Sequence, residues 1–129
     1  MSTSKRILVV DDEPEIVELL TDILTGHGYE VDSAYRAKEA LELVRASIYD
    51  AAILDFNLPD MDGVMLHRKI RQMDEELADA TLFTSALVQS DKNLGYYSAH
   101  GHGFLHKPFD VVEVLDALQS LWEASGEDA

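Results

Sequence analysis

The sequence contains no cysteine. This absence excludes disulfide bonds, thiol catalysis and thiolate metal sites. The chain also lacks an apolar run long enough to cross a membrane. Its first residues, Met1–Arg6, do not form the hydrophobic stretch of a signal peptide. We therefore expect a cytoplasmic protein that makes no use of a membrane.

Positive charge is also scarce. The chain carries 10 lysine and arginine residues against 25 aspartate and glutamate residues, for a formal net charge of −15. Nucleic-acid phosphates would repel such a fold unless it kept a concentrated basic patch, and the basic residues do not cluster in the sequence. We therefore expect no direct binding to nucleic acid. Divalent cations and basic protein surfaces are the natural counterparts of this charge.

What the chain does contain is a regular alternation of strand-like and helical patterns, with 47% hydrophobic residues. The predicted strands are Ile7–Val10, Tyr29–Ala34, Ala51–Leu54, Leu82–Thr84 and Gly103–Leu105. The predicted helices begin near Pro14, Ala37, Val64, Gln89 and Asp110. This alternation predicts an α/β fold, a parallel sheet with helices on both faces. A chain of 129 residues forms one domain, with an expected core over about residues 5–124 and a flexible tail at 125–129.

Local details of the helices are predicted as well. Arg36 is a poor N-cap, so the start of the helix near Ala37 is left open. Met73 is expected to face inward at the end of the third helix. Glu75, Glu76 and Asp79 are expected to form a solvated connection. The last helix, to about Glu123, is expected to bury Val111, Val112, Leu115, Leu118 and Trp122.

Several polar residues stand where a predicted strand ends. They are Asp11 and Asp12 after the first strand, Asp55 after the third, Ser85 after the fourth and Lys107 after the fifth. The carboxyl ends of parallel strands share one edge, so the fold would gather these groups, and this edge is where open α/β sheets place ligands. Asp55 alone could be only a turn cap. The whole set favours a functional site.

The acidic residues of this set predict a metal site. Neighbouring carboxylates repel one another and raise the pKa of at least one member, a conflict that a divalent cation removes. Mg²⁺, or Mn²⁺, prefers such oxygen ligands. We predict Asp12 and Asp55 as direct ligands, Asp11 as a ligand through water, and a backbone carbonyl near Asn57 as a further one. The alternative is that the acids before Pro14 only cap a helix.

The same residues suit phosphoryl transfer. A carboxylate beside Mg²⁺ can act as a nucleophile toward phosphorus and form an aspartyl phosphate. Such a transfer depends on positioning and on neutralising negative charge. Lys107 would supply a second positive centre, and the Ser85 hydroxyl could donate a hydrogen bond to a phosphoryl oxygen. Asp55 is the predicted nucleophile.

Over residues 5–124 the chain resembles the receiver domain of two-component response regulators. Asp11-Asp12 resembles the acidic pair of that family, Asp55 the phosphoacceptor, and Ser85-Ala86 the hydroxyl switch. Further matches are Pro59 and Met61-Asp62-Gly63 in the loop after the phosphoacceptor, and Lys107-Pro108-Phe109 after the fifth strand. The resemblance implies a flavodoxin-like (βα)5 fold with strand order 2-1-3-4-5. It also implies a cis peptide bond between Lys107 and Pro108.

The resemblance further implies a switch. A histidine kinase or histidine phosphotransfer protein would supply the phosphoryl group to Asp55 with Mg²⁺. Ser85 would then move toward the phosphate, and Phe104 would turn inward into the vacated space. The face formed by the fourth helix, fifth strand and fifth helix would change and be read by a downstream effector or a fused output domain. The same face could also join two copies in a homodimer.

Two side chains beside the expected phosphate would set its lifetime. Asn57 lies two residues after Asp55, and Leu87 lies two residues after Ser85, where the family often has a polar or charged residue. An apolar side chain hinders an attacking water molecule. Our hypothesis is therefore a relatively long-lived phosphoaspartate.

Two other functions compete with this one. A phosphatase of the haloacid-dehalogenase type would carry a second acid two residues after the nucleophile, where this chain has Asn57, and would need room for a cap domain. An unphosphorylated scaffold of the same fold should have lost part of the site, yet Asp12, Asp55, Ser85 and Lys107 are all present. We therefore predict a non-enzymatic regulator that assists its own phosphorylation and dephosphorylation. Whether it acts alone or within a longer protein is left open.

Overall fold

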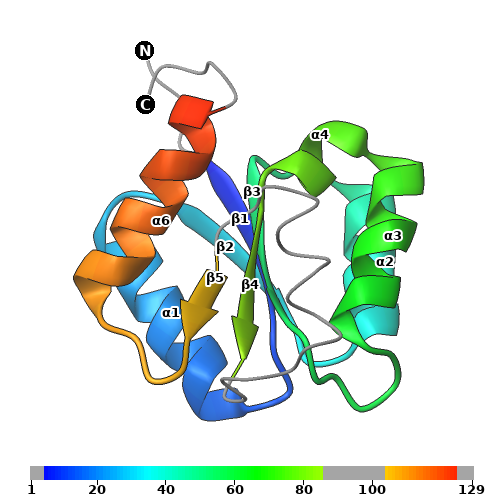
Figure 1. The fold of residues 1–129 in the computed structure, drawn as a ribbon, viewed down its shortest axis with the longest axis horizontal. Coiled ribbons are helices and arrows are strands. Elements are labelled where there is room, and N and C mark those ends of the chain that lie inside the picture. Colours follow the sequence, from blue (N-terminus) through cyan, green and yellow to red (C-terminus); the bar gives the residue numbers. More distant parts are fainter. Residues whose placement is uncertain (1–4, 86–103, 125–129) are drawn as a thin grey trace.

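Five parallel strands form the centre of the structure, a computed structural model that describes residues 5–85 and 104–124. The strands are β1 (Arg6–Val10), β2 (Glu30–Ala34), β3 (Ala51–Asp55), β4 (Thr81–Ser85) and β5 (Phe104–His106). The helices are α1 (Pro14–Gly26), α2 (Ala37–Ala46), α3 (Gly63–Met73), α4 (Glu75–Asp79) and α6 (Val111–Ala124) (Figure 1). The strand order β2-β1-β3-β4-β5 confirms the predicted fold class. The helix predicted over 89–100 and the tail at 125–129 lie outside the described residues.

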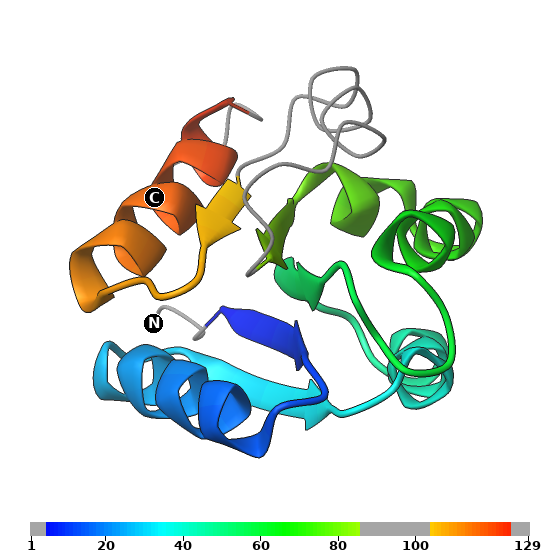
Figure 2. The same ribbon diagram turned by 60° about the horizontal axis from the view of Figure 1, so that its bottom comes forward.

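The sheet is buried on both faces. Ile7 and Val9 of β1 pack into one core with α1 and α6, whereas Leu8 and Val10 pack into a second core with α2, α3 and α4. Figure 2 shows the two groups of helices on opposite sides of the strands. Successive strand residues point to opposite faces, so strands covered on both sides must be apolar throughout. This explains the uninterrupted hydrophobic runs before Asp11 and Asp55.

The buried stripe of α6 is rotated relative to our prediction. Leu118 and Trp122 are buried as predicted, together with Val114 and Leu121, and Leu115 is half-buried. Val111 and Val112, which we expected to be buried, are 41% and 63% exposed. β5 has only three residues, so the first turn of α6 has little sheet to pack against. The prediction that the buried face of α6 begins at Val111 and Val112 was therefore wrong, because it rested on their apolar character alone.

Trp122 closes the core at the end of the sheet where the strands begin. Its Nε1–H donates to the carbonyl oxygen of Asp50, the residue before β3, at 3.2 Å. The ring of Tyr29 lies 5.7 Å from it, centroid to centroid, and the ammonium group of Lys5 lies 4.7 Å above it. A large aromatic ring with its N–H satisfied can be buried without an unpaired donor.

The short helix α4 replaces the solvated connection that we predicted after α3. The carboxylate of Asp74 caps it by accepting a hydrogen bond from the Leu77 amide at 3.1 Å, and Leu77 and Ala78 are buried. The ring of buried His67 on α3 hydrogen-bonds the Ala78 carbonyl at 2.8 Å. The acids of this segment are exposed, so their polarity hid the two buried residues between them. Met73, expected inside, is 40% exposed.

The start of α2, left open by the sequence, is fixed from a distant loop. Arg36 precedes the helix and makes no capping hydrogen bond with its side chain. The carboxylate of Asp60 instead accepts hydrogen bonds from the amides of Ala37 at 2.9 Å and Lys38 at 3.0 Å.

The described helices include none that is both long enough and apolar enough to span a bilayer.

Candidate functional site

The carboxyl ends of β1 and β3 bring the predicted acids together. Asp11 follows β1 and Asp55 ends β3, and both are buried, with 1% and 3% of their surface exposed. Asp12 and Glu13 are exposed beside them. Carboxylate oxygens from all four lie within 4.8 Å of one another. We had not predicted Glu13; its position directly after the acidic pair was the only signal in the sequence.

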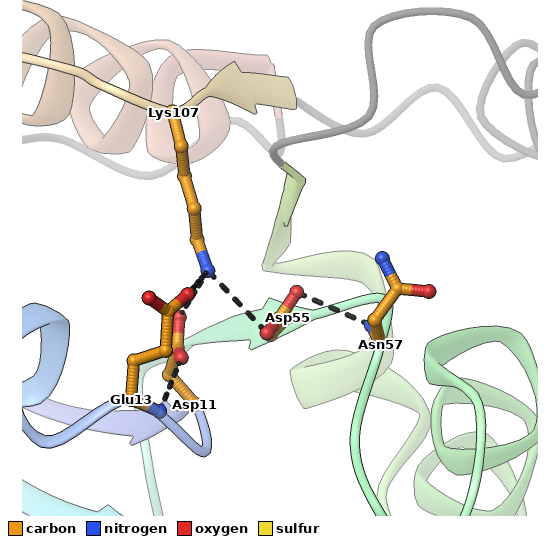
Figure 3. A network of polar contacts seen from close by, with 5 residues as sticks. All are labelled: Asp11, Glu13, Asp55, Asn57 and Lys107. Carbon is orange, nitrogen blue, oxygen red and sulfur yellow. Dashed lines mark hydrogen bonds and ion pairs between the residues drawn. The ribbon is translucent and has the colours of Figure 1, made fainter.

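Lys107 reaches into this cluster from the segment after β5 (Figure 3). Its Nζ lies 2.8 Å from Asp11 Oδ2, 3.0 Å from Glu13 Oε1 and 3.4 Å from Asp55 Oδ2. The peptide bond between Lys107 and Pro108 is cis, as the resemblance implied. Burial alone would lower the pKa of Lys107, but the three carboxylates outweigh it and hold the pKa above its ordinary value. The ammonium group therefore stays charged.

The two buried carboxylates are harder to ionise than in water. Burial, and then the charge of Asp11, raise the pKa of Asp55 to about 6, against the amide of Asn57 and the charge of Lys107. Burial also raises the pKa of Asp11, against the contact with Lys107. Four carboxylates share one ammonium group among the described residues. The cluster is thus short of positive charge.

The donor set fits a small divalent cation. All its donors are oxygens, the ligands that Mg²⁺ and Mn²⁺ prefer. Among the described residues, buried Asp11 Oδ2 accepts no hydrogen bond of good geometry, although Lys107 Nζ is its ion-pair partner. Such an oxygen has a lone pair left for a cation. Asp11, Asp12 and Asp55 therefore lie close enough together, with Glu13, to hold one cation, and their role as ligands stays a prediction.

The loop after Asp55 is tightly closed. The amide of Asn57 donates to Asp55 Oδ1 at 3.2 Å, and Asn57 pairs with Asp62 in an antiparallel bridge. The Gly63 amide then donates to the Phe56 carbonyl at 2.8 Å. A Cβ atom on Gly63 would lie 2.6 Å from Phe56 Cδ1, 2.8 Å from Phe56 Cα and 3.0 Å from the Asp55 carbonyl oxygen. Only glycine fits there without moving the backbone that carries Asp55.

We expect Gly63→Ala to lower the free energy of unfolding by about 1–3 kcal/mol, the usual cost of overpacking a filled site. Urea unfolding followed by circular dichroism would measure it. Gly26→Ala is the matched control, because no heavy atom lies within 4 Å of its added methyl group. Gly26 also ends a helix, so its replacement should be neutral or slightly stabilising. Equal effects of the two substitutions would contradict the close approach at Gly63.

The remaining predicted residues are placed only in part. Phe104 is half-buried, packs against the core beneath α2, α3 and α4, and lies opposite Phe83 in register. Its inward movement stays a prediction. The backbone of Ser85 ends β4 and pairs with His106 of β5, but its hydroxyl is outside the described part of the structure. Leu87 lies outside it altogether.

Comparison with known proteins identifies a family for this chain. Residues 7–119 match the family model of the response regulator receiver domain. The transcriptional regulatory protein PrrA of Mycobacterium bovis is 33% identical over 127 residues, which cover 98% of this chain and 54% of that protein. The chain thus spans about half the length of the curated relatives it matches.

Solved structures that resemble this chain include response regulators and their receiver domains. A CheY-like response regulator receiver domain protein from Methanospirillum hungatei has a TM-score of 0.88 at 28% identity, covering 98% of this chain and 100% of that one. The response regulator TrrA of Thermotoga maritima, solved in complex with Mg²⁺-BeF, has a TM-score of 0.78 at 35% identity. That match covers 91% of this chain and 98% of that one.

Proposed function

Because this chain belongs to the family of response regulator receiver domains, we propose that it is a phosphorylation-controlled switch of two-component signalling with Asp55 as its phosphoacceptor. The observation that carries this proposal is the position of Lys107 Nζ, 3.4 Å from Asp55 Oδ2 within a cluster of four acids. A buried nucleophile, a fixed cation and oxygen ligands for a metal are the parts that phosphoryl transfer needs.

The proposed reaction moves one phosphoryl group. A carboxylate oxygen of Asp55 attacks the phosphorus of a phosphohistidine on a histidine kinase or a histidine phosphotransfer protein. A P–O bond forms while the P–N bond breaks, and its electron pair stays on the imidazole nitrogen of the donor. The ammonium group of Lys107 stabilises the negative charge on the phosphoryl oxygens. The Ser85 hydroxyl would donate a further hydrogen bond to one of them.

A divalent cation completes the proposed charge balance. Mg²⁺, or Mn²⁺, held by Asp12, Asp55, the carbonyl of Asn57 and, through water, Asp11, would supply positive charge at the phosphoryl oxygens. Support comes from the four carboxylates that face one ammonium group among the described residues and from TrrA, whose solved complex contains Mg²⁺. Without a cation the carboxylates of this chain would repel an anionic donor.

The proposed output follows from the position of β5 beside β4. Movement of Ser85 toward the phosphate would let Phe104 turn inward, and the surface around β5 and α6 would change with it. A downstream effector, or an output domain fused to the receiver, would read that surface, and the same surface could join two copies. The likeness to PrrA, a transcriptional regulatory protein about twice as long as the match, favours a fused output domain.

The test is phosphorylation of the wild-type chain. We expect acetyl phosphate with Mg²⁺ to add one phosphoryl group, which mass spectrometry maps to Asp55 and hydroxylamine removes. Chelation of the divalent cation should abolish the reaction. No incorporation, or a label on another residue, would refute the proposal.

Leu87 provides a prediction about the lifetime of the phosphoaspartate. If an apolar side chain hinders the attacking water, we expect Leu87→Glu to lose the label several-fold faster than the wild type. The measurement is the decay of the isolated phosphoprotein in Mg²⁺ without donor. A variant that decays no faster than the wild type would count against the hypothesis.

A further inference from the structure

The helix α2 and the loop after Asp55 are joined by one side chain. Oδ1 of Asp60 accepts from the Ala37 amide at 2.9 Å, and Oδ2 accepts from the Lys38 amide at 3.0 Å. An ordinary N-cap comes from the residue just before the helix and satisfies one or two amides. Here that residue, Arg36, makes no such contact. The cap of α2 belongs to a segment more than twenty residues away in the chain.

The anchor at the α2 end is rigid. Ala37 and Ala40 are fully buried in the core under α2 and α3. The two amides that bind Asp60 therefore cannot shift without moving that core. Slight desolvation raises the pKa of Asp60, but the two amide donors outweigh it, so this pKa lies below its usual range. The carboxylate is thus charged at neutral pH and holds the positive end of the helix dipole.

The loop that carries Asp60 is attached at its base to the candidate site. Asp60 stands in the loop whose base is closed by the Asn57–Asp62 bridge. Asn57 itself donates its amide to Asp55 Oδ1 at 3.2 Å. The loop is therefore held at its base by the sheet edge and at Asp60 by α2. These two attachments fix the path of the backbone that leaves Asp55.

We propose that Asp60 is a positioning residue, which sets the backbone at Asn57 for binding of a divalent cation beside Asp55. The inference rests on the proposed function and concerns the same site, on which Asp60 acts through its attachment to α2. Mg²⁺ demands near-ideal octahedral geometry and tolerates little displacement of its ligands. Replacing a residue that orients a metal ligand, without binding the metal itself, commonly lowers the affinity for the metal by tenfold or more.

The experiment compares Asp60→Ala with Asp74→Ala. Asp74 is the matched control, because its carboxylate caps α4 with one hydrogen bond to the Leu77 amide and it is not in the acidic cluster. Isothermal titration calorimetry of the intact chain with MgCl₂ gives the dissociation constant. We expect Asp60→Ala to raise this constant by about tenfold and Asp74→Ala to leave it unchanged. Asp60→Asn, which keeps one acceptor oxygen, should fall between Asp60→Ala and the wild type.

Phosphorylation by acetyl phosphate supplies a second readout. Asp60→Ala should need more Mg²⁺ for its half-maximal rate, while its rate at saturating Mg²⁺ should approach that of the wild type. A loss of thermal stability alone would not raise the Mg²⁺ requirement while leaving the rate at saturating Mg²⁺ near that of the wild type.

Three results would overturn the inference. They are an unchanged Mg²⁺ affinity in both Asp60 variants, an equal loss in Asp74→Ala, and no Mg²⁺ binding by the wild type. If Asp60→Ala fails to fold, Asp60→Asn decides alone. A wild type that binds Mg²⁺ but takes up no phosphoryl group would refute the proposed function, while the calorimetric comparison would still decide the role of Asp60.

Discussion

Replacing Lys107 with methionine is expected to slow phosphorylation of Asp55 by about a hundredfold or more, the usual loss when one preorganised donor to a developing oxyanion is removed. Methionine has similar length but no charge. The same change should lower the free energy of unfolding by about 3–5 kcal/mol at neutral pH without divalent cations. The reason is that Asp11 and Asp55, both nearly fully buried, would lose the partner of their charge.

The rate is measured with acetyl phosphate at saturating Mg²⁺, and the stability by urea unfolding in EDTA. Lys69→Met is the control, because Lys69 is exposed on α3 and its removal changes the net charge equally. The loss of stability in Lys107→Met should shrink at about pH 5, because Asp55, whose pKa is about 6, is neutralised by protonation below that value. Phosphorylation of Lys107→Met at the wild-type rate would refute the role of Lys107.

Replacing Asp55 with asparagine is expected to have opposite effects on function and stability. Phosphorylation should be lost, since the amide oxygen is not a carboxylate nucleophile. The folded state should gain on the order of 2–3 kcal/mol in EDTA at neutral pH, because an ionised carboxylate with a pKa of about 6 is disfavoured by burial. Such a gain would mean that Asp55 lowers the stability of the folded state, so its presence has a functional reason and not a structural one.

The pH dependence of this gain follows from the direction of the shift. The folded-state pKa of Asp55 is raised from its ordinary value of 3.8 to about 6, so between these values the folded chain holds a proton that the unfolded chain has released. Wild-type stability therefore falls as the pH rises through this window. The difference between Asp55→Asn and the wild type should be absent below about pH 4 and complete above about pH 6.

Urea unfolding of both proteins in EDTA across this range measures the difference. Addition of Mg²⁺ should reduce the difference in stability between Asp55→Asn and the wild type, because a ligand that binds the folded wild type stabilises its folded state. Asp50→Asn is not a suitable control, since Asp50 accepts a hydrogen bond from the Arg6 amide. Asp22→Asn is suitable, because Asp22 is exposed on α1. Equal labelling of Asp55→Asn and the wild type would refute the central proposal.

Much of the fold could be predicted from the sequence because its pattern is local. The apolar runs that end at Asp11 and Asp55 are what a doubly covered strand requires, and parallel connection brings their ends together. The errors arose where local chemistry misled. Polar residues around Leu77 concealed α4, and the apolar character of Val111 and Val112 implied a burial that the short strand β5 cannot provide.

The candidate site was predictable to the extent that each group ends or follows a strand. Asp11 and Asp12 follow β1, Asp55 is the last residue of β3 and Lys107 follows β5, and the structure brings them together. Glu13 was missed because an acid before Pro14 is also what a helix start favours. The link from Asp60 to α2 could not be found, because Ala37 and Lys38 are distant in the chain and their amides leave no mark in the sequence.

The burial of Trp122 decides what intrinsic fluorescence can report. It is the single tryptophan of the chain, and its indole N–H is held by Asp50, which precedes the five-residue strand that ends at Asp55. At about 3.3 Å per residue, the backbone from Asp50 to Asp55 spans roughly 16 Å. Tryptophan emission is therefore an optical gauge of the integrity of the core. The acidic cluster lies at the other end of that strand, so a separate probe is needed to measure its occupancy.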